Sequence, residues 1–297
     1  MVSMNQLNNQ RRSQVIACLV EGMSIRSTVR VTGVAKNTIV KLLAEVGQAC
    51  ADFQDTTLRN LDSTRIECDE IWSFCYSKQK NIPEEFVGTP GYGDVWTWTA
   101  IDADTKLVPS WLVGERTNKD AYFFLKDLHS RLKNRVQLTT DGHHPYLAVV
   151  EPLFGADGID FAMLHKIYGN QPTGAKNSPE RTYSPAECTG TEVRVITGNP
   201  DPSLISTSYV ERQNLTMRMG MRRFTRLTNG FSKKIENHAH AVSLHFMFYN
   251  FARPHQTLSK NFGKPTTPAM AAGKANHVWS TWEIAELLVA QHVTQPV

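Results

Sequence analysis

The sequence predicts an α/β protein with a mixed sheet flanked by helices, preceded by a small all-helical unit. The chain has 297 residues, 41% apolar and 20% charged, which is enough for one large domain and a small appendage. From about residue 64, stretches rich in β-branched and aromatic residues alternate with stretches of helical periodicity. The first 50 residues show helical spacing throughout. These three observations exclude disordered and fibrous classes.

The N-terminal unit, residues 1–50, is expected to contain three short helices. They run over 12–21, 24–31 and 36–50, with Gly22 and Gly33 at the breaks. The apolar residues keep helical spacing across the second break, which is typical of a DNA-binding helix-turn-helix. The third helix then presents side chains suited to phosphates and base edges, namely Lys36, Asn37, Thr38 and Lys41. A small helical cap with a solvated charged face is the alternative.

A linker and the large domain follow. Residues 51–63 are polar and lack a period, which predicts a linker, so the helical unit is expected to be separable from the domain at 64–272. The elements expected in that domain are, in chain order, strands at 64–76, 95–101 and 107–113, a helix at 118–132, a strand at 135–140, a helix at 145–154 and a strand at 161–168. This order predicts a mixed sheet with helices packed on it.

The last third of the chain starts with a long irregular stretch. Residues 152–202 hold six of the 14 prolines and six of the 18 glycines, which predicts a loop insertion at about 169–205. Two helices are expected after it, at about 207–224 and 234–251. The C-terminal tail, residues 273–297, is expected to carry a short helix.

Positive charge is concentrated in two segments. The net charge is +4, and the first 50 residues account for it with six basic and two acidic side chains. Residues 212–234 carry seven basic residues and no acidic one. This distribution favours a polyanion such as double-stranded DNA as the partner. The arginines of the second segment expected to contact DNA are Arg218, Arg222, Arg223 and Arg226.

Location and redox state follow from what the sequence lacks. The longest apolar runs fall short of the roughly 18 residues that a membrane-spanning helix needs, and the polar N-terminus has no signal-peptide core. The expectation is a cytoplasmic, nucleoid-associated protein with no membrane partner. The five cysteines, an odd number without a C-x-x-C pair, are expected to be reduced thiols.

Three carboxylates are candidates for chemistry. Asp69 lies inside a strand, where a charge is costly unless it is paired or binds a metal. Asp141 ends the strand at 135–140, beside Gly142. If the first and fourth strands are parallel neighbours, the two aspartates are adjacent. Glu211 lies early on the helix at 207–224, with Arg218 and Arg222 further along the same face.

The chemistry of these donors points to a hard cation. Three carboxylates without a histidine or cysteine cluster favour Mg²⁺ or Mn²⁺, and two such ions can activate a water or 3′-hydroxyl for attack on phosphorus. Each carboxylate taken alone is also compatible with a cap or an ion pair. Glu67 shares the strand face of Asp69, Glu70 points the other way, and Asp102 and Asp104 are typical of a turn.

Four strings of residues carry a resemblance to a known family. They are Cys68 to Phe74, Val95 to Ala100, Leu138 to His143 and Ser208 to Asn214. Together they closely resemble the transposases of the bacterial insertion-sequence-one family, which are Asp-Asp-Glu recombinases on a ribonuclease H-like fold. The resemblance covers roughly residues 64–272.

The resemblance implies a site and a function. Asp69, Asp141 and Glu211 are its catalytic metal ligands, and Arg218 matches a position that related recombinases use to touch DNA. The implied enzyme binds inverted-repeat transposon ends as a homo-oligomer, cleaves them and joins them to target DNA. The chain lacks the cysteine-paired zinc finger that is common in the family. A metal-dependent nuclease and a domesticated DNA-binding regulator with an idle site are the alternatives.

Overall fold

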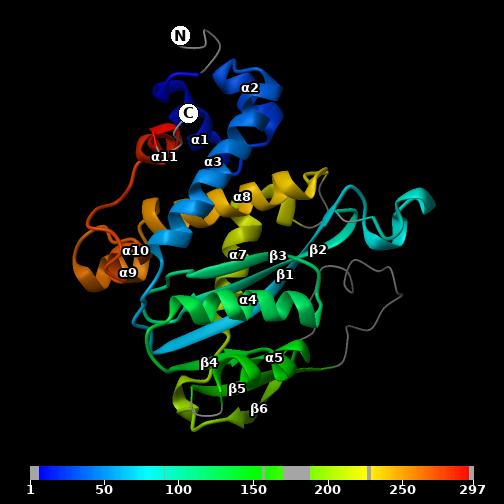
Figure 1. Ribbon diagram of the computed structural model, residues 1–297, viewed down its shortest axis with the longest axis vertical. Helices are drawn as coiled ribbons and strands as arrows, with labels where there is room; N and C mark the ends of the chain where they lie inside the picture. Colours follow the sequence, from blue (N-terminus) through cyan, green and yellow to red (C-terminus); the bar gives the residue numbers. More distant parts are fainter. Residues whose placement is uncertain (1–6, 90, 156–157, 170–187, 226–228, 294–297) are drawn as a thin grey trace.

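The computed structural model describes residues 7–89, 91–155, 158–169, 188–225 and 229–293. The N-terminal helices lie at one end of the molecule and the sheet lies toward the other (Figure 1). Among the described residues, no helix combines the length and apolarity needed to cross a membrane. All five cysteines are free thiols.

The sheet has six strands in the order β3-β2-β1-β4-β5-β6. Their bounds are β1 (Arg65–Cys75), β2 (Gly93–Asp102), β3 (Ser110–Gly114), β4 (Val136–Thr140), β5 (Ile159–Tyr168) and β6 (Cys188–Thr197). The pairs β1·β2, β2·β3 and β5·β6 are antiparallel, whereas β1·β4 and β4·β5 are parallel. The mixed sheet and the parallel pairing of the first and fourth strands are therefore confirmed.

Strand β6 differs from the expectation. Residues 188–197 lie inside the segment predicted as a loop insertion, yet they pair with β5, with Val193 opposite Leu164. The high proline and glycine content of the surrounding stretch concealed a run of β-branched residues from Thr191 to Thr197. Residues 170–187 of the expected insertion lie outside the described residues.

Helices cover both faces of the sheet. On one face, α4 (Asn118–Arg131) and α5 (Pro145–Phe154) pack on a core that includes Trp98 and Phe161. On the other face, α7 (Ser208–Gly220) and α8 (Ile235–Met247) enclose Ile71. Beyond α8, the chain continues through a π turn (Phe248–Ala252), α9 (Gln256–Phe262), α10 (Pro268–Ala271) and α11 (Thr281–Val293).

The N-terminal helices α1 (Asn9–Val20), α2 (Ile25–Thr32) and α3 (Lys36–Thr57) form as expected. Gly33 ends α2 with a φ of 69°, a left-handed conformation that glycine adopts without strain. The predicted linker at 51–63 is different, because α3 runs on to Thr57 and is followed by the buried Leu58. Helices α1 and α3 share one core with α8 and α11. Residues 7–57 are thus packed against the C-terminal third of the chain.

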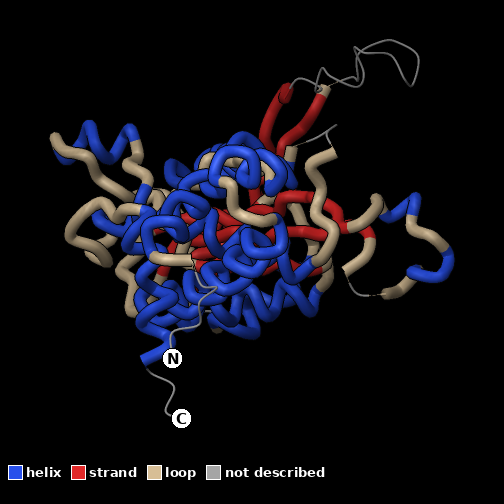
Figure 2. The backbone as a smooth tube through the Cα atoms, turned by 90° about the horizontal axis from the view of Figure 1, so that it is seen from above, coloured by secondary structure: helices blue, strands red, loops and turns tan. Residues whose placement is uncertain are grey.

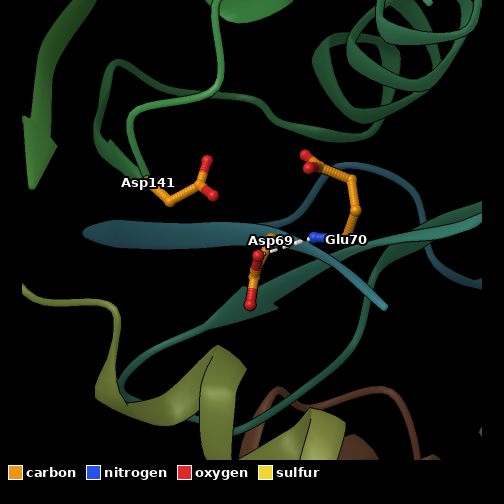
Figure 3. Close-up of side chains that lie close together, drawn as sticks. All are labelled: Asp69, Glu70 and Asp141. Carbon is orange, nitrogen blue, oxygen red and sulfur yellow. Dashed lines mark hydrogen bonds between the residues drawn. The ribbon is translucent and has the colours of Figure 1, made fainter. Parts of the chain in front are cut away.

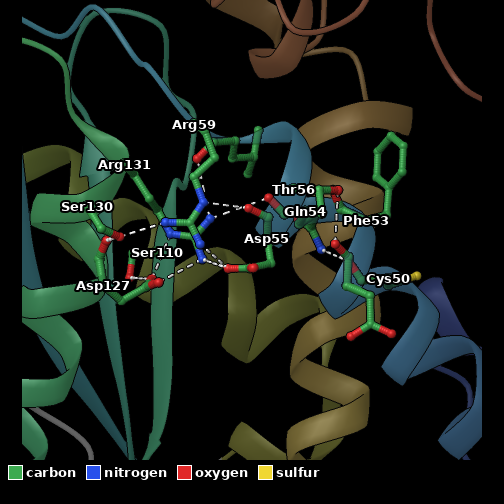
Figure 4. A network of polar contacts seen from close by, with 12 residues as sticks. Cys50, Phe53, Gln54, Asp55, Thr56, Arg59, Ser110, Asp127, Ser130 and Arg131 are labelled. Atoms are coloured by element: carbon green, nitrogen blue, oxygen red, sulfur yellow. Dashed lines mark hydrogen bonds and ion pairs between the residues drawn. The ribbon is translucent and has the colours of Figure 1, made fainter.

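A polar network ties the end of α3 to the sheet domain (Figure 4). Arg131, at the end of α4, pairs with Asp127 at 2.7 Å and with Asp55 of α3 at 2.8 Å. Its guanidinium also donates to the carbonyl oxygens of Gln54 and Leu58. This arginine side chain is 8% exposed, so it joins the two helices from inside the protein.

We expect Arg131→Met to lower the free energy of unfolding by roughly 2–4 kcal/mol, because it removes the buried cation that Asp55, Asp127 and two carbonyl groups share. Urea unfolding followed by circular dichroism measures this effect. Lys133→Met is the control, since Lys133 and Asp62 form a pair whose side chains are 50% and 73% exposed. The control should change stability by about 0.5 kcal/mol or less. If Arg131→Met lowered the free energy of unfolding no more than the control does, the network would not stabilise the fold.

Candidate active site

Asp69 and Asp141 lie side by side where β1 and β4 stop pairing. The parallel register ends with Cys68 opposite Thr140, so Asp69 and Asp141 are the next residues on the two chains. Gly142 then passes the ring of His165, where a β-carbon would come within 2.2 Å of the ring. The sheet therefore brings the two aspartates together, as the strand order predicted.

Glu70 is a third carboxylate at this place, and sequence reasoning set it aside. Asp69 and Glu70 leave β1 toward opposite sides, and Asp141 enters from the loop after β4 (Figure 3). Each of the three side chains nevertheless has an oxygen within 4.8 Å of the other two. Alternation along the strand correctly predicted that Glu70 points the other way. It did not show that Asp141, in the loop that follows β4, lies close to carboxylates on both sides of β1.

Short hydrogen bonds fix the two aspartates. Asp69 accepts from the amide of Glu70 and from the side-chain amide of Asn214 on α7, both at 2.8 Å. Asp141 accepts from the amide of His143 at 3.0 Å. Each carboxylate therefore has a defined orientation before any ligand arrives.

The guanidinium of Arg116 forms ion pairs with two carboxylates of the cluster. Arg116 lies 3.2 Å from Glu70 and 3.7 Å from Asp141, and it stacks over the ring of Trp96. Because a single positive charge faces three carboxylates, the cluster is short of positive charge.

This excess of negative charge shows in the pKa values. Burial, reinforced by the charge of Asp141, raises the pKa of Asp69 to about 7 from an ordinary value of 3.8. Burial and Asp141 likewise raise the pKa of Glu70 to about 8. A divalent cation would supply the positive charge that these groups lack.

Glu211 stands apart from the three. It lies in the first turn of α7, where Thr207 donates to it at 2.7 Å and Lys166 of β5 forms an ion pair with it. Its charge contributes to the raised pKa of Asp69, so it faces the same region. Lys166 was not predicted, because 45 residues separate it from Glu211 and no local pattern links them.

Glu67 has a different task from the carboxylates of the cluster. One of its oxygens accepts from the backbone amides of Tyr209 and Val210, at 2.7 and 3.0 Å. These amides belong to the first turn of α7, whose helix dipole favours a negative charge. Glu67 therefore anchors the helix that carries Glu211.

The expected DNA-contact residues fall into distinct surroundings. In α3, Lys36, Asn37 and Lys41 are exposed and Thr38 is half-buried. Arg222 is exposed and Arg218 is half-buried, whereas Arg226 lies outside the described residues. Arg223 is half-buried and donates to the hydroxyl of Ser232 and to the carbonyl of Asn237, so part of its hydrogen-bonding capacity is used within the protein. Burial lowers its pKa to about 10.

The histidines of α8 take structural places. His238 is buried and bonds the hydroxyl of Ser232 at 2.8 Å, and His245 is buried as well. His240 is half-buried against α3, where Gly47 makes close contact with it. None of them belongs to the group of Asp69, Glu70 and Asp141.

We expect Asp69→Asn to stabilise the protein in the absence of divalent cations. A carboxyl whose pKa is raised on folding costs stability at every pH above its unfolded pKa, and the full cost is reached above the folded pKa. The gain should therefore be largest above pH 7, on the order of 1–3 kcal/mol, and should fade toward pH 4. Urea unfolding in EDTA at pH 5 and pH 8 tests this.

Asp104→Asn is the control for this effect, since Asp104 is an exposed turn residue that pairs with Arg65. Its stability difference from the wild type should not grow between pH 5 and pH 8. A lower stability of Asp69→Asn at pH 8 would contradict the electrostatic account of the cluster.

Comparisons with known proteins show a likeness to solved structures and to no protein-family model or curated protein. Among solved structures, the chain is similar to a piggyBac transposase, seen by cryo-electron microscopy as a synaptic complex with hairpin DNA. The identity is 10% and the TM-score 0.42, over 100% of this chain and 76% of that chain. The function of this chain is therefore inferred from its own residues.

Proposed function

We propose that the chain is a DNA transposase that cuts and joins DNA at a divalent-metal site held by Asp69, Asp141 and Glu211. The observation that carries this proposal is the meeting of Asp69, inside β1, with Asp141, just after β4, under a helix that presents a third carboxylate. The mixed six-stranded sheet with helices on both faces is consistent with the ribonuclease H-like architecture of such enzymes.

The residues fit a hard cation. The donors are carboxylate oxygens, and the raised pKa values of Asp69 and Glu70 mark a place that is short of positive charge. Asp69, Asp141 and Glu211 would hold the ion or ions, and Glu70 is a further candidate ligand. Bound Mg²⁺ or Mn²⁺ supplies activation of a water or 3′-hydroxyl and stabilises the leaving oxygen.

The remaining groups position these carboxylates. Asn214 holds Asp69 from α7, and Glu67 holds the first turn of the same helix. Arg116 pairs with Asp141 from the opposite side. Glu211 would have to exchange Lys166 for the metal to join the aspartates. The two aspartates are therefore oriented before DNA binds, which lowers the cost of reaching the transition state.

DNA binding is proposed for the exposed face of α3 and for the region after α7. Lys41 and Asn37 line a hollow of about 470 Å³ together with Lys234 and Asn237 at the start of α8. Lys41 and Lys234, one from each basic segment of the sequence, thus lie at the same hollow, together with Glu236. A phosphate backbone lying there would contact both lysines.

We expect Arg222→Ala to weaken binding equally for all DNA sequences and to reduce the slope of log affinity against log salt by about one unit. Fluorescence anisotropy over a salt series measures both effects. Lys119→Ala is the matched control, because Lys119 is exposed on α4, which covers the opposite face of the sheet. An unchanged slope for Arg222→Ala would remove this arginine from the interface.

A joining assay separates the candidate functions. The protein is incubated with Mg²⁺, labelled transposon-end duplexes and a supercoiled target, and the products are resolved on gels. Joined products support the transposase, cut but unjoined DNA supports a nuclease, and sequence-specific binding without cutting supports a regulator.

A further inference from the structure

Strand β6 forms an open edge of the sheet in the described part of the chain. It follows β5 at the end of the strand order, and ten residues, Cys188–Thr197, belong to it. Figure 2 shows the ends of β5 and β6 projecting from the body of the molecule. The outer edge of such a strand carries backbone N–H and C=O groups that can pair with another strand.

The side chains of β6 are unusual for a free edge. Val193 and Val195 are 48% and 54% exposed. Glu192 and Arg194 are also exposed, and neither side chain forms a hydrogen bond or ion pair with another described residue. Edge strands that remain single are blunted by bulges, prolines or a row of charges. The pairing of β6 with β5 has register shifts near both ends, at Phe161/Ala162 and Ile167/Tyr168, whereas residues 190–195 pair in an unbroken register and contain no proline. Here two charges of opposite sign flank an exposed valine.

We propose that β6 pairs antiparallel with β6 of a second copy of this chain, with Val193 on the two-fold axis. The two-fold axis that relates two antiparallel neighbouring strands is perpendicular to the sheet. It therefore lies midway between one residue and the same residue of the other copy, which face each other directly across the interface. Centring the axis on Val193 places Glu192 of each copy opposite Arg194 of the other. The two charge pairs then form at once, and Thr191 faces Val195.

Other symmetric registers lose this match. An axis at Glu192 puts two glutamates opposite each other, and an axis at Arg194 does the same with two arginines. An axis at Thr191 leaves Glu192 opposite Gly190. Like charges placed directly opposite are destabilising, so the sequence of β6 selects the register centred on Val193.

A charge exchange tests the interface in the full chain. Size-exclusion chromatography with light scattering should show a dimer for the wild type. Arg194→Glu and Glu192→Arg each create two like-charge pairs, so each should weaken dimerisation about tenfold or more. The double variant E192R/R194E restores both pairs in reverse and should restore the dimer. Circular dichroism confirms that every variant is folded.

A crosslink tests the register. In a Cys188→Ser background, Val193→Cys places two thiols opposite each other, and mild oxidation should give a covalent dimer. Val195→Cys is the control, because the two copies of this position are offset by four residues, or roughly 13 Å, which exceeds the reach of a disulfide.

The outcomes decide the proposal. A monomeric wild type, a dimer that both single charge reversals leave intact, or equal crosslinking at 193 and 195 would overturn it. A double variant that stays monomeric while folded would overturn it as well. DNA binding and cutting do not enter these measurements, so the interface and the proposed function can fail separately.

Discussion

Asp141→Asn should abolish metal-dependent cutting and joining of DNA, by at least about a thousandfold, while the protein stays folded. The change removes one charge and one anionic oxygen from the metal site at nearly constant volume, and metal stabilisation of the transition state is worth several kcal/mol. Asp69→Asn and Glu211→Gln should do the same. Product formation on supercoiled plasmid and on labelled duplex, with Mg²⁺ and with EDTA, measures the loss.

Asp104→Asn is the matched control for this series, because Asp104 is half exposed and pairs with Arg65 away from the cluster. It is a better control than Asp102, which is buried and accepts from Ser63 and from the amides of Asp104 and Thr105. Normal turnover by a variant of Asp69, Asp141 or Glu211 would remove that residue from the site. An inactive Asp104→Asn would show that Asp104 is needed for activity and would contradict the assignment of the catalytic aspartates.

The second large effect is expected from deleting residues 1–60. The truncated protein should fail to fold, because α3 packs along α8 and buries Leu43, Val46 and Cys50. Its removal would expose the apolar side of α8 and strip Arg131 of its partners on α3. Burial stabilises the fold by about 25 cal/mol per Å² of apolar surface. The free energy lost with a whole helix interface therefore exceeds the net free energy of unfolding of an ordinary domain.

Gly47→Val is a milder version of the same test. A β-carbon at Gly47 would come within 2.5 Å of His240, so the larger residue should separate the two helices and lower the unfolding midpoint. Circular dichroism and size-exclusion chromatography report on both proteins. A truncated chain that is monodisperse and unfolds cooperatively would show that the sheet domain stands alone.

The sequence predicted most of the sheet because its signals are local. Stretches rich in β-branched and aromatic residues marked β1 and β2, and a strand ending in Asp141-Gly142 marked the end of β4. The adjacency of Asp69 and Asp141 then followed from the rule that parallel strands share an edge, and the structure confirms it. Their role as catalytic ligands stays a proposal.

The remaining features depend on contacts that no local pattern encodes. Strand β6 owes its place to pairing with β5, and Arg223 is turned inward by partners 9 and 14 residues away. The polar residues after Cys50 suggested a linker, but Gln54 of that stretch is buried and bonds Ser243 and Asn250 across the helix interface. Packing against α8 therefore overrides the composition of this segment.

The most direct test of the metal site is a change of donor atom at Asp141. Asp141→Cys replaces a hard oxygen by a softer sulfur, which disfavours Mg²⁺ more than Mn²⁺. Plasmid nicking by the folded variant should therefore be lost with Mg²⁺ and regained in part with Mn²⁺, whereas the wild type works with both. Equal activity of the variant with the two ions, or no activity with either, would contradict direct contact between Asp141 and the metal of the reaction.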